Sequence, residues 1–515
     1  MDKPQTLDLL LGRGRDDAPA ITAPGKAALT YDGLRRLIGR TGGALADQGV
    51  GRKDCVVMVL PNGPLAATGF LAIASHAIAA PLNPAYGPEE FEFFLADLNA
   101  RLVIVANGES SGVRQAAEKL GIAVAEIVEV KNSPAGVFEF KDRTSQGQVT
   151  PPPALKPDDI ALYLHTSGTT SRPKLVPLSH RNLCLSAANI ADTLGLCESD
   201  HCLNIMPLFH IHGLVAALLA SLFGRARVCC SDGFNGLKFF SLMDEVLPTW
   251  FTAVPTMHQM ILDRAAHNKD VVSRHSLRFM RSSSAALPPR LLSDMEAAFG
   301  APMIEAYGMT EAAHQMTSNP LPPGERKPGT VGQAAGPEFT ILDQTGKTLG
   351  PNLPGEVAIR GANVTKGYVN NAAANAQAFT DGWFRTGDQG MVDDDGYLTI
   401  TGRLKEIINR GGEKISPREV DEVLLKHPLV AQAVTFAMPH DKLGEEVAAA
   451  IVLVDGVGGE AEVGGGIESD LRKFAGAHLA PFKVPRRIVI VAEIPKGPTG
   501  KLQRIGLASK LGLAS

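Results

Sequence analysis

The chain lacks a cysteine framework, an excess of positive charge and any long apolar run. Its 515 residues include six cysteines, none in a Cys-x-x-Cys spacing, which suits reduced thiols in the cytoplasm. The formal net charge of −4 provides no basic field for nucleic acid. No apolar run approaches the roughly 20 residues of a membrane span, and no N-terminal basic segment precedes an apolar core. We therefore expect a cytoplasmic protein, monomeric or weakly homo-oligomeric, without nucleic-acid or membrane partners.

A chain of this length is too long for one compact core, so two or more domains are expected. Through about residue 400, short β-branched runs alternate with longer amphipathic stretches, which is typical of an α/β domain. Strands are predicted at 56–60 and 102–105, and a helix at 89–98.

The last 110 residues or so, by contrast, follow the pattern of a small α+β unit. Ser416-Pro417-Arg418-Glu419 is a capping box with proline at the first helical position, and this helix should end near 426–428. The further elements predicted are strands at 433–438, 447–454 and 487–491, a glycine-rich loop at 456–466 and a helix at 468–478. We expect an α/β protein with a large N-terminal domain of mixed sheets and helices (1–402), a hinge (403–406) and a small mobile lid (407–515).

The most informative stretch is Thr166-Ser167-Gly168-Thr169-Thr170-Ser171-Arg172-Pro173-Lys174. It follows the apolar run 160–164, which predicts a hydroxyl-rich loop leaving a buried strand. Its hydroxyls and backbone N–H groups can donate to phosphate oxygens, and Lys174 adds a positive charge. Pro173 precedes that lysine, so the stretch differs from the kinase-type P-loop, which ends in Gly-Lys-Ser/Thr. The loop favours a different nucleotide chemistry, with a polar surface turn as the alternative.

Four further motifs follow along the chain. They are Tyr307-Gly308-Met309-Thr310-Glu311, Gly382-Trp383-Phe384-Arg385-Thr386-Gly387-Asp388, Gly402-Arg403-Leu404-Lys405 and Pro495-Lys496-Gly497-Pro498-Thr499-Gly500-Lys501. In order and spacing, the five motifs resemble the adenylate-forming superfamily of acyl-CoA synthetases, luciferases and peptide-synthetase adenylation domains. The resemblance covers nearly the whole chain.

This resemblance implies an enzyme that uses ATP, Mg²⁺ and coenzyme A. A carboxylate attacks the α-phosphate of ATP to give an acyl-adenylate and pyrophosphate, and coenzyme A then forms the thioester and releases AMP. Lys501 would neutralise phosphate charge in the first step, and Thr310 would hydrogen-bond the α-phosphate. Glu311, together with Thr170, would hold Mg²⁺, which prefers oxygen ligands. His210 completes the expected catalytic set.

For the nucleotide, the resemblance implies that Tyr307 stacks on adenine, Asp388 accepts the ribose hydroxyls and Arg403 reinforces that contact. A core tyrosine and a surface Asp–Arg pair are the alternatives. The expected cofactor-binding residues are Thr166, Ser167, Gly168, Thr169, Thr170, Lys174, Ser284, Ala285, Ala286, Glu305, Ala306, Tyr307, Gly308, Thr310, Asp388, Arg403, Lys405, Gly411, Gly412 and Lys501.

Lys405 marks the expected hinge. In the resemblance, a backbone rotation there swings the small domain between an adenylating pose, with Lys501 in the site, and a thioester-forming pose. Gly411 and Gly412 would then help to form the channel for the pantetheine arm of coenzyme A, although the same glycines also predict a β-turn.

The segment Pro207-Leu208-Phe209-His210-Ile211-His212-Gly213 matches the one that borders the acyl pocket in this superfamily. On an extended strand, His210 and His212 would point the same way, and His314 adds a third imidazole. Three histidines also raise the possibility of zinc, but no cysteine or carboxylate spacing supports a closed metal site.

A small dicarboxylate brings a second negative charge that cannot be buried without donors. The three histidines together with Ser282, Ser283 and Ser284 supply donors, and we expect the histidines, Ser283 and Ser284 to contact the acid. The runs 307–322 and 169–173 resemble the oxalate–CoA ligase branch, which makes oxalate the expected acid. Malonate, another short acid or a coumarate-type aromatic acid are alternatives, as is an enzyme that loads a carrier protein. Ser171 and Leu175 depart from the glycines usual in the phosphate loop of this superfamily.

Overall fold

The computed structural model describes residues 3–109, 112–141, 154–166, 173–454, 466–495 and 503–513. The chain forms two compact units. One consists of Met1–Phe339 with Ile359–Phe384, and the other of Thr340–Ala358 with Arg385–Ser515. This division places Thr340–Ala358 and 385–402, which fall in the predicted N-terminal domain, in the second unit, and the hinge at 403–406 stays a prediction. None of the helices in the described ranges is long and apolar enough to cross a membrane.

A seven-stranded sheet in the first unit has the order β7-β6-β5-β3-β4-β8-β9. Its strands are β3 (Cys55–Val59), β4 (Ile78–Pro81), β5 (Ala100–Ala106), β6 (Ala123–Glu129), β7 (Phe138–Phe140), β8 (Ile160–Thr166) and β9 (Lys174–Ser179). The inner strands pair in parallel, whereas β7 and β9 are antiparallel to their neighbours. Every residue of β3 is buried, as a central parallel strand requires. The strands predicted at 56–60 and 102–105 are confirmed as β3 and β5.

Helices accompany this sheet along the chain. They are α2 (Tyr31–Asp47), α3 (Pro64–Ala74), α4 (Pro88–Asp97) and α5 (Gly112–Leu120). The helix predicted at 89–98 is confirmed as α4. It begins with Pro88 at the first helical position, and the Glu90 side chain accepts a hydrogen bond from the Gly87 N–H, which caps the helix.

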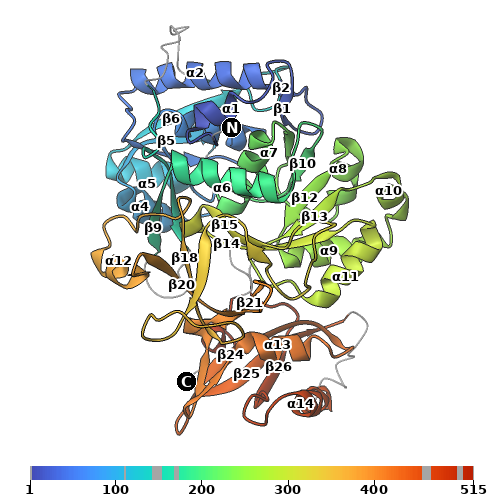
Figure 1. Ribbon diagram of the computed structural model, residues 1–515. Helices are drawn as coiled ribbons and strands as arrows, with labels where there is room; N and C mark the ends of the chain where they lie inside the picture. The colour runs from blue at the N-terminus through green and yellow to red at the C-terminus, as the bar shows by residue number, and fades with distance from the viewer. Residues whose placement is uncertain are drawn as a thin grey trace. The chain divides into compact units, whose positions relative to one another are not determined.

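The second sheet of this unit has nine strands in the order β16-β15-β14-β13-β12-β10-β11-β1-β2. Its strands are β1 (Pro19–Thr22), β2 (Leu29–Thr30), β10 (His201–Asn204), β11 (Arg227–Cys230), β12 (Trp250–Ala253), β13 (Phe279–Ser282), β14 (Met303–Met309), β15 (His314–Ser318) and β16 (Gln333–Ala334). Helices α8 (Phe239–Val246), α9 (Pro255–Ala265), α10 (Lys269–Arg274) and α11 (Pro289–Phe299) gather beside β12 and β13 (Figure 1). Phe251 of β12 and Met280 of β13 pack with these helices in one apolar cluster.

The largest apolar core contains α6 (His180–Thr193), the π-helix η1 (His212–Leu219), α7 (Ala220–Phe223) and α1 (Leu7–Leu11). All eight residues of η1 are buried. The expectation that His210 and His212 share an extended strand is wrong. His210 lies in a turn and His212 opens the π-helix, because the apolar residues that follow pack on all sides as a buried helix does.

A five-stranded sheet contains β17 (Glu338–Leu342), β18 (Gly355–Arg360), β19 (Phe379–Thr380), β20 (Trp383–Val392) and β21 (Leu398–Arg403), and α12 (Ala372–Ala378) precedes β19. The last sheet, in the second unit, has the order β23-β22-β25-β24, with β26 beside β25. Its elements are β22 (Ile408–Arg410), β23 (Glu413–Ile415), β24 (Val430–His440), β25 (Gly444–Leu453) and β26 (Arg487–Ile490), with α13 (Pro417–Leu424), α14 (Gly466–His478) and α15 (Leu507–Lys510). The strands and the helix predicted after residue 430 are confirmed, and the loop predicted at 456–466 lies, except for its last residue, outside the described residues.

Helix α13 begins as predicted, with Ser416 at the N-cap and Pro417 at the first position. The capping box itself does not form. The Ser416 hydroxyl donates instead to the backbone oxygen of Thr401 in β21, because that carbonyl lies within its reach. Val420, Val423 and Leu424 are buried, and their spacing places them on one face of the helix.

Candidate active site

The predicted phosphate loop joins two paired strands. Thr166 ends β8, Lys174 begins β9, and the two residues are register partners. The Thr166 hydroxyl donates to the backbone oxygen of Lys174 at 3.4 Å, which closes the base of the loop. Ser167, Gly168, Thr169 and Thr170 lie outside the described residues, as does Ser171. The loop therefore leaves a buried strand as expected, and its phosphate contacts remain a prediction.

Lys174, Tyr368 and Glu311 form a chain of contacts that sequence reasoning missed. The Lys174 ammonium lies 4.4 Å from the centroid of the Tyr368 ring, a cation–π contact. The Tyr368 hydroxyl donates to Oε1 of Glu311 at 2.9 Å. An expected phosphate ligand and an expected metal ligand are thus linked through one tyrosine. No sequence pattern singles out Tyr368, because the loop that contains it follows β18, far along the chain from both partners.

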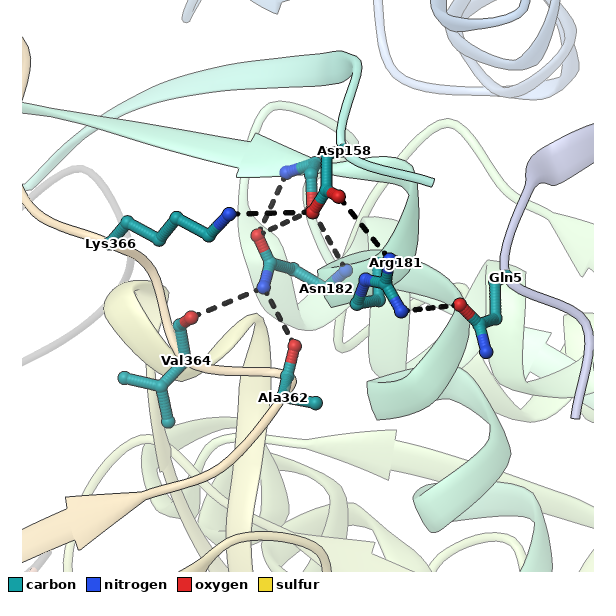
Figure 2. A network of polar contacts seen from close by, with 8 residues as sticks. Gln5, Asp158, Arg181, Asn182, Ala362, Val364 and Lys366 are labelled. Atoms are coloured by element: carbon teal, nitrogen blue, oxygen red, sulfur yellow. Dashed lines mark hydrogen bonds and ion pairs between the residues drawn. The ribbon is translucent and has the colours of Figure 1, made fainter. Parts of the chain in front are cut away.

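The segment before Tyr368 is fixed to the start of α6 (Figure 2). Ser179 and Asn182 cap that helix reciprocally, which orients the Asn182 side chain. Its amide then donates to the backbone oxygens of Ala362 at 2.9 Å and Val364 at 3.2 Å. Figure 2 also shows Asp158 facing the cationic groups of Arg181 and Lys366. A helix cap, rather than a mobile turn, thereby positions the polypeptide beside Glu311.

The same segment also binds the backbone around Glu311 directly. The N–H of Thr365 donates to the Glu311 backbone oxygen at 2.7 Å. The Asn363 amide donates to the backbone oxygens of Ala312 at 2.8 Å and Gln315 at 3.3 Å. Both the main chain and the carboxylate of Glu311 are therefore held by residues 363–368.

Glu311 fits the role of a Mg²⁺ ligand. Its side chain is nearly buried, it supplies the hard oxygen atoms that Mg²⁺ prefers, and Tyr368 fixes the orientation of the carboxylate. Thr170, the other expected ligand, lies outside the described residues. Among the described residues, no three His, Cys, Asp or Glu side chains cluster as a metal site, which applies to His210, His212 and His314 as well.

The residues expected around adenine occupy β14 and the turn after it. Glu305 and Ala306 are buried, whereas Tyr307, Gly308 and Thr310 are half-buried. A Cβ atom at Gly308 would lie 1.9 Å from the backbone oxygen of His314, so only glycine allows β14 and β15 to approach this closely. Tyr307 is thus placed at a constricted strand end with part of its ring accessible.

The small-residue segment after β13 changes from buried to exposed within four positions. Ser283 is buried, Ser284 is half-buried, and Ala285 and Ala286 are exposed. Ser284 adopts a φ of 74°, a left-handed conformation that non-glycine residues rarely hold and that is often found at binding sites. This conformation accompanies a specific contact of the Ser284 hydroxyl with His212.

His212 is the centre of a polar cluster of side chains. Its Nδ1 lies 3.1 Å from the Ser284 hydroxyl and its Nε2 lies 2.7 Å from the Thr252 hydroxyl. The ring of His314 is 5.0 Å from that of His212, and both histidines are buried. His210 is half-buried, and the centroid of its ring lies 6.3 Å from the centroid of the Phe209 ring. The described structure thus brings together His212, His314 and Ser284 and adds Thr252. The contact of these residues, of His210 and of Ser283 with the acid stays a prediction.

Arg281 is a further residue that sequence reasoning missed. It is fully buried in β13, and its guanidinium donates to Thr252 Oγ1 at 3.5 Å and to Gln315 Oε1 at 3.2 Å. Burial lowers the pKa of the Arg281 guanidinium to about 9, so it remains protonated at pH 7. A lone arginine in the apolar run Phe279-Met280-Arg281-Ser282 was the signal that could have identified it.

The second unit contains the ribose-binding candidates. Arg403 Nε lies 2.8 Å from Asp388 Oδ1, and the two residues are register partners in β20 and β21. Asp388 is buried, and its N–H donates to the Thr386 hydroxyl at 3.1 Å. Burial raises the pKa of nearby Glu406, although Arg504, at 3.3 Å, opposes the shift. The expected Asp–Arg pair therefore forms in a partly desolvated setting.

The hinge and channel candidates lie in the same unit. Lys405 is exposed in the short 3₁₀ helix η3 (Leu404–Glu406). Gly411 and Gly412 form the turn of the β22–β23 hairpin with φ of 58° and 100°, the two positive values that such a tight turn needs. The β-turn interpretation is thus correct, and the role in a channel stays a prediction. Lys501 lies outside the described residues.

Comparison with known proteins matches residues 12–369 to the family of AMP-binding enzymes and residues 419–501 to the AMP-binding enzyme C-terminal domain. The chain is 46% identical to an oxalate–CoA ligase of Arabidopsis thaliana over 493 residues, covering 95% of this chain and 94% of that protein. It is 41% identical to an oxalate–CoA ligase of Saccharomyces cerevisiae, with 90% and 88% coverage. The structure of an anthranilate CoA ligase in complex with anthranoyl-AMP superposes with a TM-score of 0.87 at 28% identity, with 99% and 98% coverage.

Proposed function

The chain belongs to the family of AMP-binding enzymes, and on that premise we propose that it is an ATP-dependent acid–CoA ligase whose acid is oxalate. Enzymes of this family have a large N-terminal and a small C-terminal domain and use ATP, Mg²⁺ and coenzyme A, and the chain shares this fold. We further expect a cytoplasmic enzyme that acts as a monomer or weak homo-oligomer and needs no nucleic-acid partner.

In the first half-reaction, a carboxylate oxygen of the acid attacks the α-phosphorus of ATP, and the bond to pyrophosphate breaks. Thr310 would donate to the α-phosphate, while Glu311, oriented by Tyr368, would hold the Mg²⁺ that offsets phosphate charge. Tyr307 would stack on adenine, and Asp388 with Arg403 would bind the ribose. Lys501 would neutralise the charge that develops on the phosphate.

In the second half-reaction, the thiol of coenzyme A attacks the acyl carbon, its proton passes to solvent or a base, and AMP leaves. A backbone rotation at Lys405 would move Lys501 out of the active site and bring Gly411 and Gly412 into it. Because glycine has no side chain, the backbone at Gly411 and Gly412 can approach a ligand closely.

The observation that carries the choice of acid is the polar environment of His212. The imidazole contacts the hydroxyls of Ser284 and Thr252 and lies beside His314, all at buried or half-buried positions. The alkyl chain of a fatty acid makes no hydrogen bonds to these polar groups, whereas a short dianion needs such donors to be buried. The oxalate–CoA ligases that resemble this chain over nearly their whole length support the same acid.

The test is pyrophosphate release with a panel of acids, each measured with and without coenzyme A. We expect release with oxalate and complete conversion to the thioester only when coenzyme A is present. Efficient use of coumarate or of a medium-chain fatty acid, with none of oxalate, would exclude oxalate and leave the ligase class standing. A protein that releases pyrophosphate with an acid, shows no response to coenzyme A and transfers the acyl group to a carrier protein would overturn the assignment of coenzyme A as the acceptor.

A further inference from the structure

A buried positive charge lies behind the acyl side of the site. Arg281 is 0% exposed, and within the described part of the chain no carboxylate pairs with it. Its only acceptors there are two neutral groups, Thr252 Oγ1 and Gln315 Oε1. A buried guanidinium without a counter-charge is costly, so such a residue normally has a reason to be retained.

The surrounding polar groups are arranged to accept from a cation. The Gln315 side-chain nitrogen donates to the Thr193 hydroxyl and to the Ala335 backbone oxygen, each at 3.1 Å, so its oxygen is the atom turned to Arg281. Three further polar atoms in β13 and just after it are buried without a hydrogen-bond partner among the described residues. They are Arg281 Nε, Ser282 Oγ and Ser283 Oγ. Buried donors are normally hydrogen-bonded, so these atoms add to the polar character of this end of β13.

Thr252 connects the arginine to the acyl side. A guanidinium has only donors, so Arg281 occupies a lone pair of the Thr252 oxygen and favours pointing the hydroxyl proton away, toward His212 Nε2. His212 would then carry its own proton on Nδ1 and donate it to Ser284. That arrangement leaves the Ser284 proton available for a carboxylate of the acid.

We propose that Arg281 is a positioning residue that makes the acyl pocket select a second negative charge, by fixing the Thr252–His212–Ser284 relay and by adding its own positive potential. The inference rests on the proposed ligase function and identifies the feature of the acid that is selected. Arg281 does not need to touch the acid, because a charge in a site of low dielectric acts over several ångströms.

The experiment compares two acids of nearly equal shape, oxalate and its monoanionic amide, oxamate. Their dissociation constants are measured by calorimetry on the full-length protein with Mg²⁺ and a non-hydrolysable ATP analogue. We expect the wild type to prefer oxalate and the preference to fall about tenfold or more in Arg281→Met. Arg281→Lys keeps the positive charge, so this variant should retain much of the preference for oxalate over oxamate.

Two further variants separate selection from folding. Arg278→Met is the matched control, since Arg278 lies just before β13 but pairs with the buried carboxylate of Asp200, so its loss should lower stability and leave the oxalate preference unchanged. Thr252→Val breaks the relay with little change in volume, and it decides the question if Arg281→Met does not fold. In ¹⁵N-histidine spectra, His212 should lose its fixed Nδ1–H tautomer in Thr252→Val.

An unchanged oxalate-to-oxamate ratio in folded Arg281→Met, or in Thr252→Val when that variant alone folds, would overturn the inference. So would a wild type that binds the two acids equally. If the wild type turns over malonate and not oxalate, the proposed acid is wrong, and malonate against its monoamide then tests Arg281 in the same way. A wild type that activates only monocarboxylates would overturn this inference and the choice of oxalate, and would leave the ligase class standing.

Discussion

The Tyr368 hydroxyl donates a 2.9 Å hydrogen bond to Oε1 of Glu311, and the same tyrosine ring accepts the Lys174 ammonium on its face. One side chain thereby orients the expected metal ligand and the lysine at the base of the phosphate loop. The loop that carries Tyr368 is fixed by hydrogen bonds of Asn182 and Thr365, so these contacts hold the tyrosine in place beside Glu311.

Tyr368→Phe should weaken the use of Mg²⁺ while leaving the fold intact. A hydrogen bond to a charged group contributes about 1.5–3 kcal/mol, so we expect the adenylation rate at limiting Mg²⁺ to fall by about tenfold or more. The measurement is pyrophosphate release against Mg²⁺ concentration. Tyr31→Phe is the control, because the Tyr31 hydroxyl donates to the backbone oxygen of Ala226 at 2.8 Å in the core. Equal Mg²⁺ dependence in both variants would contradict the role of Tyr368.

Removal of the His314 imidazole should reduce oxalate turnover by well over tenfold. Loss of a buried hydrogen bond to a charged group in a binding site typically costs about 2–5 kcal/mol. His314 has a φ of 104°, so His314→Gly deletes the ring without backbone strain and is a better test than His314→Ala alone. Mg·ATP affinity, measured by calorimetry, should be retained. Loss of ATP affinity equal to the loss of turnover would assign His314 to the nucleotide or to folding.

Lys501→Ala should abolish acid-dependent pyrophosphate release and leave thioester formation from a supplied acyl-adenylate largely intact. The reason is that the lysine is expected in the site only while the phosphate charge develops. Both half-reactions are followed separately by pyrophosphate and thioester assays. A loss of similar size in the two half-reactions would point to a structural role instead.

Lys405→Pro should have the opposite effect on the two half-reactions. Proline fixes φ and would obstruct a backbone rotation at this position, so adenylation should survive while thioester formation falls. Lys405→Ala is the matched control, because it removes the side chain and keeps the freedom of the backbone. Normal transfer to coenzyme A in the proline variant would exclude a hinge at residue 405.

His258 should make the first unit less stable as the pH falls below about 6.5. Burial lowers the pKa of this histidine from 6.5 to about 4, and its ring lies 3.1 Å from the backbone oxygen of Arg281. Between these two pH values the unfolded chain binds a proton that the folded chain does not, so the free energy of unfolding falls as pH falls. At pH 5 the loss is about 2 kcal/mol for this group.

Tryptophan fluorescence can follow this unfolding, since the two tryptophans of the chain, Trp250 and Trp383, both lie in the first unit. His258→Gln retains a side-chain amide that can reach the same carbonyl but removes the titrating group. We expect its urea midpoint to shift less between pH 7 and pH 5 than that of the wild type. Identical shifts in the two proteins would show that His258 does not contribute to the pH dependence.

The sequence by itself determined the family and several strands and helices, because these depend on local patterns and short motifs. Apolar periodicity predicted β3, β5, α4 and several elements of the C-terminal unit. Short motifs named Glu311, Asp388 and Arg403 as candidates, and the last two form an ion pair. Local reasoning failed where distant groups compete for the same atoms. Ser416 bonds to Thr401 rather than capping α13, and His212 opens a π-helix rather than lying on a strand.

Only the tertiary structure decided which side chains hold those ligands. Tyr368 reaches Glu311 across 57 positions of the chain, and Arg281 meets Gln315 across 34. Contacts of this kind follow from strand order and from how loops are anchored, which no pattern of neighbouring residues encodes. The free-energy cost of burying the charge of Arg281 depends on the groups around it, and only the fold decides which groups these are.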